Sequence, residues 1–354
     1  MSIFIISNRR VRRAHTNDGK KHFNEDGKEK ALPMFRVAEC EINDNKVEYS
    51  ILDDTFQTNY NDVVKCIKER KKKEKLSGSA RMFYELYTQM LDEKESRSDV
   101  LFFIHGFSNS FQDNLDHIAQ LHKLYIEPEH SPLRHLVYVS WPTRDHKVLT
   151  YWDDQQDAIE TGFVLGRLYL KLLAFFRELF EIHSQEQCQN KIHLAAHSMG
   201  NQVLKQMLTS IPDHKLTPLF GEVLLLHSDV EDDVFNPAQP FTKLEKLASR
   251  THMYIHNSDD ALRISRFTKN GNKRLGHRGP VDRSVLNNET FVVDVTKIRG
   301  AESLRERCVD HWGYLDRKEQ IEDIISVLIG KDEALFENRD LRPRETNYFY
   351  LKDK

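Results

Sequence analysis

The sequence predicts an α/β fold in which a mostly parallel, twisted sheet carries helices on both faces. Short apolar runs of strand length alternate with longer segments of helical spacing over most of the chain. One such run passes through a tight turn directly into a helix at Lys191–Leu208. Nearer the N-terminus, two runs of alternating apolar and polar residues flank Asn43-Asp44-Asn45, which predicts an antiparallel pair of N-terminal strands.

The strands and helices follow from these patterns in chain order. The predicted strands are Ile3–Ile6, Met34–Ile42, Val47–Leu52, Val100–Ile104, Leu136–Pro142, Ile192–Ala196, Glu222–Leu226, Met253–Ile255 and Thr290–Val295. The predicted helices are Ala80–Leu91, Phe111–Leu124, Tyr151–Ile182 and Arg317–Ile329. We expect the long helix to break or kink near Gly162 or Gly166, with a core-facing stripe that includes Phe163. Residues 12 to 32 are polar and are expected to form a long surface loop.

Length and composition set limits on the class of protein. The 354 residues, with a net charge of −3, favour a single domain over 1–354 and give no reason to expect a nucleic-acid partner. Within it we expect N-terminal strands and helices over 1–95, a core over 99–330 and a polar tail over 331–354. No apolar run approaches the ~20 residues of a transmembrane helix, and the N-terminus does not resemble a secretory signal.

The cysteines indicate the compartment. Four of them are scattered without Cys-x-x-Cys spacing, at Cys40, Cys66, Cys188 and Cys308. Thiols in this arrangement are typical of a reduced, cytoplasmic protein. We therefore expect a cytoplasmic location and no metal centre. No organic cofactor is expected either.

The segment Ala196-His197-Ser198-Met199-Gly200 lies between a predicted strand and a predicted helix. Small–x–Ser–x–Gly in this context is typical of a nucleophile elbow, where a serine at a strained turn has its hydroxyl lifted clear of the sheet. Small residues two positions before and after it avoid collision with the neighbouring strand and helix. Ser198 is the predicted nucleophile, and the Met199 N–H is the predicted oxyanion donor. A buried serine at an ordinary tight turn is the other interpretation.

A second turn, His105-Gly106-Phe107, directly follows the apolar run Val100–Ile104. Ligands bind at the carboxyl ends of strands in such sheets, and glycine lets the backbone approach a ligand closely. A turn of this kind, upstream of an elbow, supplies the second oxyanion donor. We therefore predict that the Phe107 N–H pairs with that of Met199.

A serine hydroxyl needs a general base, and the base needs an orienting acid. In folds with an elbow the chain order is serine, acid, histidine. After the last predicted strand one histidine remains as a candidate, His311 in Asp310-His311-Trp312-Gly313-Tyr314, and it is the predicted base. His197 is expected to point away from the serine.

Three aspartates are candidates for the acid. Asp259 and Asp260 follow the strand that precedes the last one, which is the usual position of the acid, and we favour Asp259. Asp229 ends the strand before that and stays an alternative. Any of them could instead cap a helix, since Ala261-Leu262 can begin one.

These residues resemble the α/β-hydrolases, and within them a bacterial branch of unassigned function. The resemblance covers about Asp99 to Gly330. Its motifs are FFIHGF at 102–107, SWPT at 140–143 with Tyr151 and Asp154 downstream, AHSMGN at 196–201, SDVEDDVF at 228–235, NSDDAL at 257–262, RLG at 274–276 and DHWGY at 310–314. It implies Ser-Asp-His roles for Ser198, Asp259 and His311. Tyr151, Asp154 and the Asp229 segment would be structural or substrate-lining. Where the branch has one acidic residue in NSDDAL, this chain has two, so Asp260 stays open.

The sequence therefore predicts a serine hydrolase that cleaves an acyl ester, with a lipid ester, thioester or amide as other bond classes. The substrate would be a small molecule or a lipid. Acyl transfer to another acceptor is a second enzymatic interpretation. A non-catalytic binding module, or an effector subunit of a bacterial assembly that docks a protein partner through residues 1–95, are rivals from another class.

Overall fold

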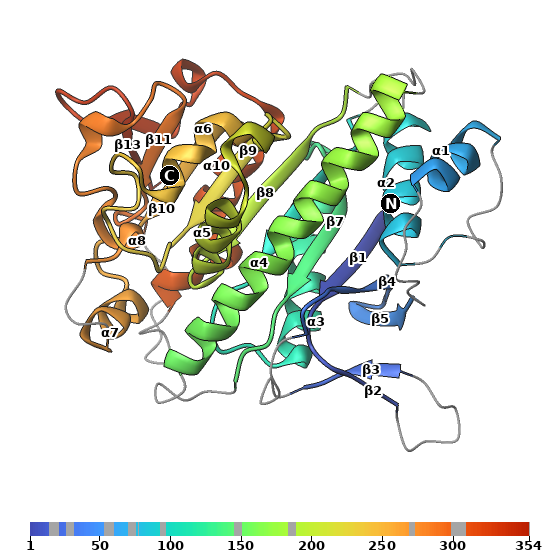
Figure 1. The fold of residues 1–354 in the computed structure, drawn as a ribbon. Coiled ribbons are helices and arrows are strands. Elements are labelled where there is room, and N and C mark those ends of the chain that lie inside the picture. The colour runs from blue at the N-terminus through green and yellow to red at the C-terminus, as the bar shows by residue number, and fades with distance from the viewer. Residues whose placement is uncertain are drawn as a thin grey trace.

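The structure, a computed structural model, describes residues 1–13, 21–25, 32–52, 60–69, 76, 78–92, 97–144, 151–182, 189–268, 273–298 and 309–353. Within these residues, eleven strands form one mixed sheet with helices on both faces (Figure 1). The predicted α/β architecture with a mostly parallel sheet is confirmed.

The strands are β1 (Ser2–Ser7), β2 (Val11–Arg13), β3 (Lys21–Phe23), β4 (Arg36–Asn43), β5 (Lys46–Ile51), β6 (Asp99–Ile104), β7 (Leu133–Ser140), β8 (Ile192–His197), β9 (Phe220–Leu226), β10 (Ala248–Ile255), β11 (Thr290–Asp294), β12 (Arg339–Leu341) and β13 (Tyr348–Leu351). The α-helices are α1 (Tyr60–Lys68), α2 (Gly78–Asp92), α3 (Phe111–Leu121), α4 (Tyr151–Phe176), α5 (Gly200–Ser210), α6 (Leu244–Leu247), α7 (Asp260–Thr268), α8 (Leu275–Arg278), α9 (Gly313–Asp316) and α10 (Lys318–Ile329).

The sheet has the order β12-β13-β11-β10-β9-β8-β6-β7-β1-β4-β5. All neighbouring strands from β13 to β1 pair in parallel, whereas β12 and β4 are antiparallel to their neighbours. The central strands read as continuous apolar runs because helices cover both faces, and every residue of β6 is buried. The predicted N-terminal antiparallel pair is β4 and β5.

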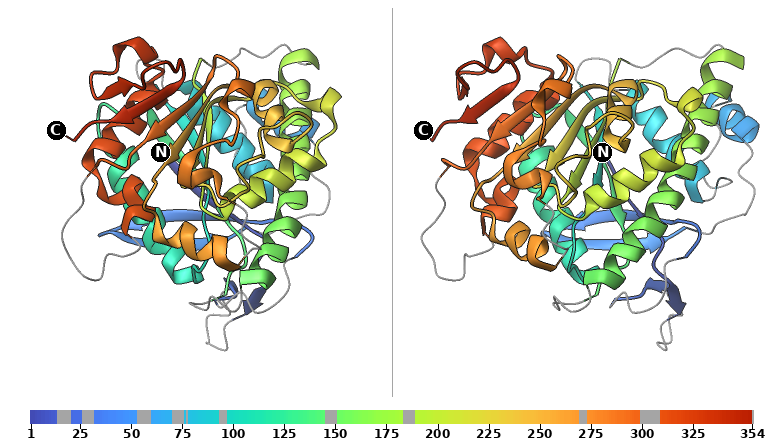
Figure 2. Two further views of the ribbon diagram at one scale, coloured as in Figure 1. Left: turned by 90° about the vertical axis from the view of Figure 1, so that its left-hand side faces the viewer. Right: turned by 60° about the vertical axis from the view of Figure 1, so that its left-hand side comes forward.

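Helices cover both faces of the sheet (Figure 2). A hydrophobic core lies beneath the helices of each face. Helices α2, α4 and α5 contribute Met82, Leu165 and Val203 to one core. Helices α3 and α10 contribute Ile118 and Ile324 to the other. The segment between β6 and β7 thus packs on one face and the segment between β7 and β8 on the other. In sheets of this kind ligands bind at the carboxyl ends of the strands, where two such connections diverge.

The expected break in the long helix is wrong, because α4 continues through both glycines. A Cβ atom on Gly162 would lie 2.5 Å from Gln206 Cβ, and one on Gly166 would lie 2.2 Å from Ser210 Oγ. The glycines therefore allow α5 to pack closely against α4. Phe163 also departs from the expected stripe, since it lies on the outer side of α4 and is 48% exposed.

The N-terminal segment is more ordered than the expected surface loop. Strands β2 and β3 pair antiparallel, and Phe23 is buried with its ring 5.2 Å from that of Phe111. Arg9 is also buried, and its guanidinium donates to the carbonyls of Glu25 and Asn109. The expectation of a loop is therefore wrong for β2 and β3, and the rest of that stretch lies outside the described residues.

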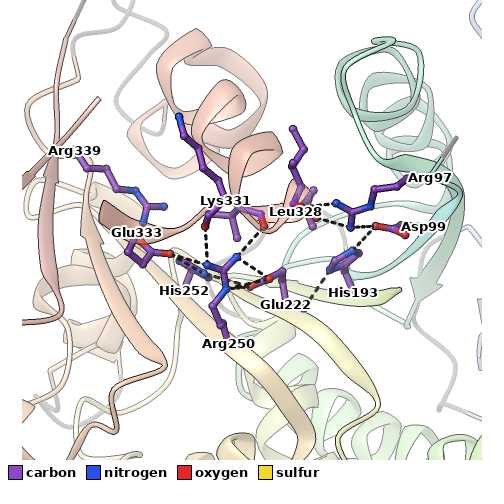
Figure 3. Close-up of polar contacts among 12 residues, drawn as sticks. Arg97, Asp99, His193, Glu222, Arg250, His252, Leu328, Lys331, Glu333 and Arg339 are labelled. Atoms are coloured by element: carbon purple, nitrogen blue, oxygen red, sulfur yellow. Dashed lines mark hydrogen bonds and ion pairs between the residues drawn. The ribbon is translucent and has the colours of Figure 1, made fainter. Parts of the chain in front are cut away.

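The amino ends of the parallel strands carry a buried network of charged side chains (Figure 3). Asp99 of β6 lies 3.1 Å from His193 of β8, and Arg250 of β10 binds both carboxylate oxygens of Glu222 of β9. The Arg250 guanidinium also donates to the Lys331 carbonyl at 2.8 Å. The network thereby ties the C-terminal segment, which adds β12 and β13 to the sheet, to the central strands.

Two composition-based expectations can be compared with the described residues. None of the helices described there is long and apolar enough to cross a membrane. Cys40 and Cys66 are free and buried. Cys188 and Cys308 lie outside the described residues.

Candidate active site

The candidate site lies at the carboxyl ends of the central strands, at the lower edge of the sheet in Figure 1. Phe107 follows β6, Ser198 follows β8, Asp229 follows β9 and Asp259 follows β10. His311 belongs to a short helical turn after β11 (Val309–Trp312). The parallel strands bring these residues, 204 positions apart from first to last, to one edge of the sheet.

Ser198 has the backbone geometry of an elbow. Its φ is 51°, in the left-handed region that non-glycine residues rarely adopt. Its N–H donates to the Leu226 carbonyl at 2.9 Å, which joins the turn to β9. A Cβ atom on Gly200 would lie 2.6 Å from the carbonyl oxygens of Ile104 and His105. The small residue two positions after the serine is therefore required for β6 to pass so close.

The turn after β6 lies directly against the serine. A Cβ atom on Gly106 would be 2.9 Å from Ser198 Cβ. The His105 side chain accepts from the Trp141 N–H at 3.0 Å, and the Trp141 ring stacks on it. Among the described residues, neither the Phe107 nor the Met199 N–H donates a hydrogen bond outside regular secondary structure. Both groups can therefore face an oxyanion near Ser198.

A buried carboxylate and a buried imidazole, those of Asp259 and His311, form a pair. His311 Nδ1 lies 2.7 Å from Asp259 Oδ2, and both side chains are buried. The other oxygen of Asp259 accepts from the Leu262 N–H at 3.1 Å, so the same carboxylate also caps α7. Asp259 thus both pairs with His311 and caps α7.

The alternative acids have other partners. Asp260 is on the surface and pairs with Arg263 at 2.9 Å. Asp229 accepts from the Tyr151 and Ser265 hydroxyls at 2.6 Å each, and Arg274 Nε lies 3.2 Å away. The geometry therefore favours Asp259 as the partner of His311.

Two further residues named from sequence have identifiable surroundings. His197 directs its Nε2 to the His311 carbonyl at 2.9 Å, so it contacts the backbone of His311 rather than the serine hydroxyl. Asp154 pairs with Arg144 at 3.1 Å, and it does not line the cavity that Ser198 and His311 share.

Burial and the neighbouring charges set the protonation states. Burial opposes the charged form of His311, but the Asp259 carboxylate outweighs it and raises the pKa of His311. Burial alone would raise the pKa of Asp259, but His311 and His227 hold it well below its usual range. The pKa of His197 is lowered well below its usual range, first by burial and then by repulsion from His311. Asp259 is therefore ionised and His197 neutral when His311 takes up a proton.

A cavity of about 660 Å³ opens onto these groups. Its lining includes Ser198, His197 and His311 together with Phe107, Asn109, His117, Tyr151, Leu262, Ser265, Trp312 and Leu315. This volume is in the range of small-molecule sites. No hydrogen bond joins the Ser198 hydroxyl to His311 among the described residues, and such bonds often form only once substrate is bound.

The same cluster has the residue types of a metal site. The ligand atoms of His227, Asp259 and His311 lie within 4.8 Å of one another. However, His311 and Asp259 are 2.7 Å apart, a hydrogen-bond distance shorter than the roughly 3.3 Å between two ligands of a tetrahedral zinc ion. As arranged, these residues share protons rather than hold an ion.

Sequence reasoning did not identify Arg9 and His227 as contributors to the site. Arg9 donates to the Asn109 carbonyl at 2.9 Å, and Thr143 both donates to that carbonyl and accepts from the Asn109 N–H. Together they fix the loop that continues from Phe107. The second contributor is His227, at 3.2 Å from Asp259 Oδ2. Its position directly after an apolar strand, like that of Ser198, is the signal that could have identified it.

Comparisons with known proteins give one family. The profile of the family described as "Alpha/beta hydrolase of unknown function (DUF900)" matches residues 84–325. No curated protein sequence shows significant similarity to this chain. A crystal structure of the "putative cell surface hydrolase from Lactobacillus plantarum WCFS1" aligns at 11% identity with a TM-score of 0.34, over 67% of this chain and 94% of that chain. The likeness to that structure is slight.

Proposed function

The chain belongs to this family of α/β-hydrolases, and we propose that it is a serine hydrolase that cleaves an acyl ester through an acyl-enzyme intermediate. The observation that carries the proposal is the pair formed by His311 and Asp259, 2.7 Å apart, at the floor of the cavity that Ser198 also lines. The left-handed turn at Ser198 supports it, because strained backbone of this kind is typical of nucleophile elbows.

In the first half of the reaction, Ser198 Oγ attacks the acyl carbonyl carbon while His311 Nε2 accepts the hydroxyl proton. The Asp259 carboxylate holds the imidazole by its Nδ1–H and stabilises the imidazolium. The N–H groups of Met199 and Phe107 stabilise the oxyanion. His311 then gives its proton to the leaving alkoxide, and the ester bond breaks to leave the acyl group on Ser198.

In the second half, water attacks the acyl-enzyme carbonyl and His311 accepts a proton from that water. The second tetrahedral intermediate collapses, His311 returns the proton to Ser198 Oγ, and a carboxylic acid leaves. The apolar walls formed by Phe107, Leu262 and Trp312 favour a substrate whose acyl group is apolar. A thioester or a lipid ester would react by the same steps.

The test is hydrolysis of p-nitrophenyl esters of increasing acyl length, with an acyl thioester alongside. The wild-type protein should hydrolyse at least one of them, and Ser198→Ala should reduce kcat/KM to background. Ser210→Ala is the matched control, because its hydroxyl donates to the Met207 carbonyl on α5 and Ser210 is not among the residues that line the cavity, so its activity should be unchanged. Equal rates for the wild type and Ser198→Ala would contradict the proposal.

A further inference from the structure

His227 is the first residue after β9, and its backbone is strained. Its φ is 46°, in the left-handed region, as is the 51° of Ser198 after the neighbouring strand β8. Since His197 pairs with Leu226 in the sheet, the two strained turns lie side by side. A non-glycine residue keeps such a conformation only where its surroundings hold it there.

Gly276 clamps the turn at His227. Its N–H donates to the Ser228 carbonyl, and its carbonyl accepts from the His256 N–H, both at 2.9 Å. A Cβ atom on Gly276 would lie 2.4 Å from the carbonyl carbon of His227 and 2.9 Å from its Cα. Only a residue without a side chain fits, so Gly276 packs directly against the backbone of His227.

The side chain of His227 is fully buried and points to Asp259. Its Nδ1 lies 3.2 Å from Oδ2, the same oxygen that His311 Nδ1 approaches at 2.7 Å. Its Nε2 is buried and has no hydrogen-bond partner among the described residues. A neutral ring carries one proton, and only a proton on Nδ1 makes a hydrogen bond here.

The groups around His227 keep it neutral. Burial lowers its pKa, and although Asp259 acts in the opposite direction, His311 and His256 add to the lowering. The titratable groups that face it are Asp259, His197, His256 and His311. When His311 becomes an imidazolium, a second positive charge on the same carboxylate is disfavoured further.

We propose that His227 is a positioning residue whose neutral Nδ1–H fixes the Asp259 carboxylate with Oδ2 toward His311. The proposal rests on the serine-hydrolase function proposed above. His227 and His311 both donate to Asp259 Oδ2, so the negative charge of this oxygen stabilises each of them less than it would a single donor. The pKa of His311 is therefore lower than it would be if His311 were the only donor to that oxygen. Removing the donor should therefore raise the pKa of His311 by about half to one unit, the equivalent of one hydrogen bond.

The test compares two substitutions of similar size. In His227→Asn the amide nitrogen takes the place of Nδ1, and asparagine tolerates the left-handed region. In His227→Gln the amide lies one bond farther out, so the space is filled but the donor is misplaced. The measurement is the rate of inactivation by a fluorophosphonate probe between pH 5 and 9, after thermal melts have verified folding.

The proposal predicts that His227→Gln shifts the midpoint of the acid limb upward by about half to one pH unit and slows the plateau rate about tenfold. His227→Asn should retain the wild-type midpoint. If both variants share the wild-type midpoint, or shift it equally, His227 only fills space and the proposal is overturned.

A measurement on the wild-type protein keeps this test independent of the reaction. Histidine ¹H–¹⁵N correlation spectra, with His227 assigned through the Asn variant, should show an Nδ1–H tautomer that stays neutral while His311 titrates. An Nε2–H tautomer or a charged His227 would overturn the proposal. If the probe fails to react with the wild type while the spectra show the Nδ1–H tautomer, the proposed function fails and the positioning contact stands.

Discussion

The two ends of the sheet each carry a buried histidine–aspartate pair, yet the pairs differ in what the second ring nitrogen does. At the amino end, His193 Nε2 lies 3.1 Å from Asp99, and its Nδ1 accepts from the Glu222 N–H at 3.2 Å. At the carboxyl end, His311 Nδ1 binds Asp259 and His311 lines the cavity. Among the described residues, its Nε2 has no hydrogen-bond partner.

The two pairs differ in whether a ring nitrogen is left without a hydrogen-bond partner among the described residues. The amino-end pair is satisfied on every side, since Asp99 also accepts from Arg97 (Figure 3). It accepts from the Lys191 N–H as well. Such a pair joins strands and has no lone pair to offer a substrate. In the mechanism proposed above, the carboxyl-end pair uses its remaining nitrogen, His311 Nε2, to accept the proton of the Ser198 hydroxyl.

The largest expected difference comes from removing each histidine in turn. His311→Ala should lower kcat/KM of the folded protein by about 10⁴- to 10⁶-fold, because it removes the proposed base. His193→Ala should leave kcat of the folded protein intact and lower the free energy of unfolding by about 2–5 kcal/mol. Ester hydrolysis and denaturant titrations measure both, and a large loss of kcat in His193→Ala would remove the distinction.

Substitution of the aspartates should distinguish the two pairs in the same way, with a smaller effect on catalysis than substitution of the histidines. Asp259→Asn is expected to lower kcat about 10²- to 10⁴-fold, because the imidazolium loses its counter-charge. Asp260→Asn, the matched control on the next residue, should hydrolyse esters at the wild-type rate. Asp99→Asn should cost stability by about 3–5 kcal/mol without lowering kcat. An equal loss in Asp260→Asn and Asp259→Asn would reopen the assignment of the acid.

The pH dependence sharpens the comparison further. Since the pKa of His311 is raised, the rate of hydrolysis should reach half its plateau above pH ~6.5. The charged form stabilises the fold below the unfolded-state pKa of about 6.5, and this contribution is lost as pH rises through the raised pKa. The stability difference between wild type and His311→Gln should therefore shrink over the pH range in which activity rises. A stability difference between the two proteins that stays constant over this pH range would contradict the expectation.

The depressed pKa of Asp259 acts at lower pH. Its ionised form contributes stability that is fully present above about pH 4 and is lost as pH falls through the folded-state pKa. Acid unfolding of Asp259→Asn should accordingly depend less on pH than that of the wild type. Urea titrations at a series of acidic pH values measure the difference.

The smallest expected effect is that of a chelator. Because His311 and Asp259 are at hydrogen-bond distance, extended dialysis against EDTA should leave ester hydrolysis unchanged. A loss of activity that added Zn²⁺ restores would instead assign a metal to His227, Asp259 and His311.

Local patterns in the sequence predict the sheet and the serine's surroundings because they depend on neighbours in the chain. The strand, turn and helix around Ser198 follow from small residues at fixed offsets, and His311 follows from chain order. The acid stayed open among Asp259, Asp260 and Asp229, because all three follow strands and only the fold decides which carboxylate meets the histidine.

Other features depend on contacts that no local pattern encodes. Gly162 and Gly166 predict a break by propensity, yet the approach of α5 requires them within a continuous α4. Arg9 follows a short polar stretch and reads as surface, but the fold buries it against the Asn109 carbonyl. His227 adopts a left-handed backbone conformation that no pattern in the neighbouring sequence predicts.

The most direct test of the central claim, that Ser198 is a nucleophile activated by His311, is to locate the adduct of a fluorophosphonate probe by peptide mass spectrometry. We predict a single adduct on the peptide containing Ser198 in the wild type and in His193→Ala, and none in His311→Ala. An adduct that persists in His311→Ala at the wild-type rate, or that forms on another residue, would contradict the account.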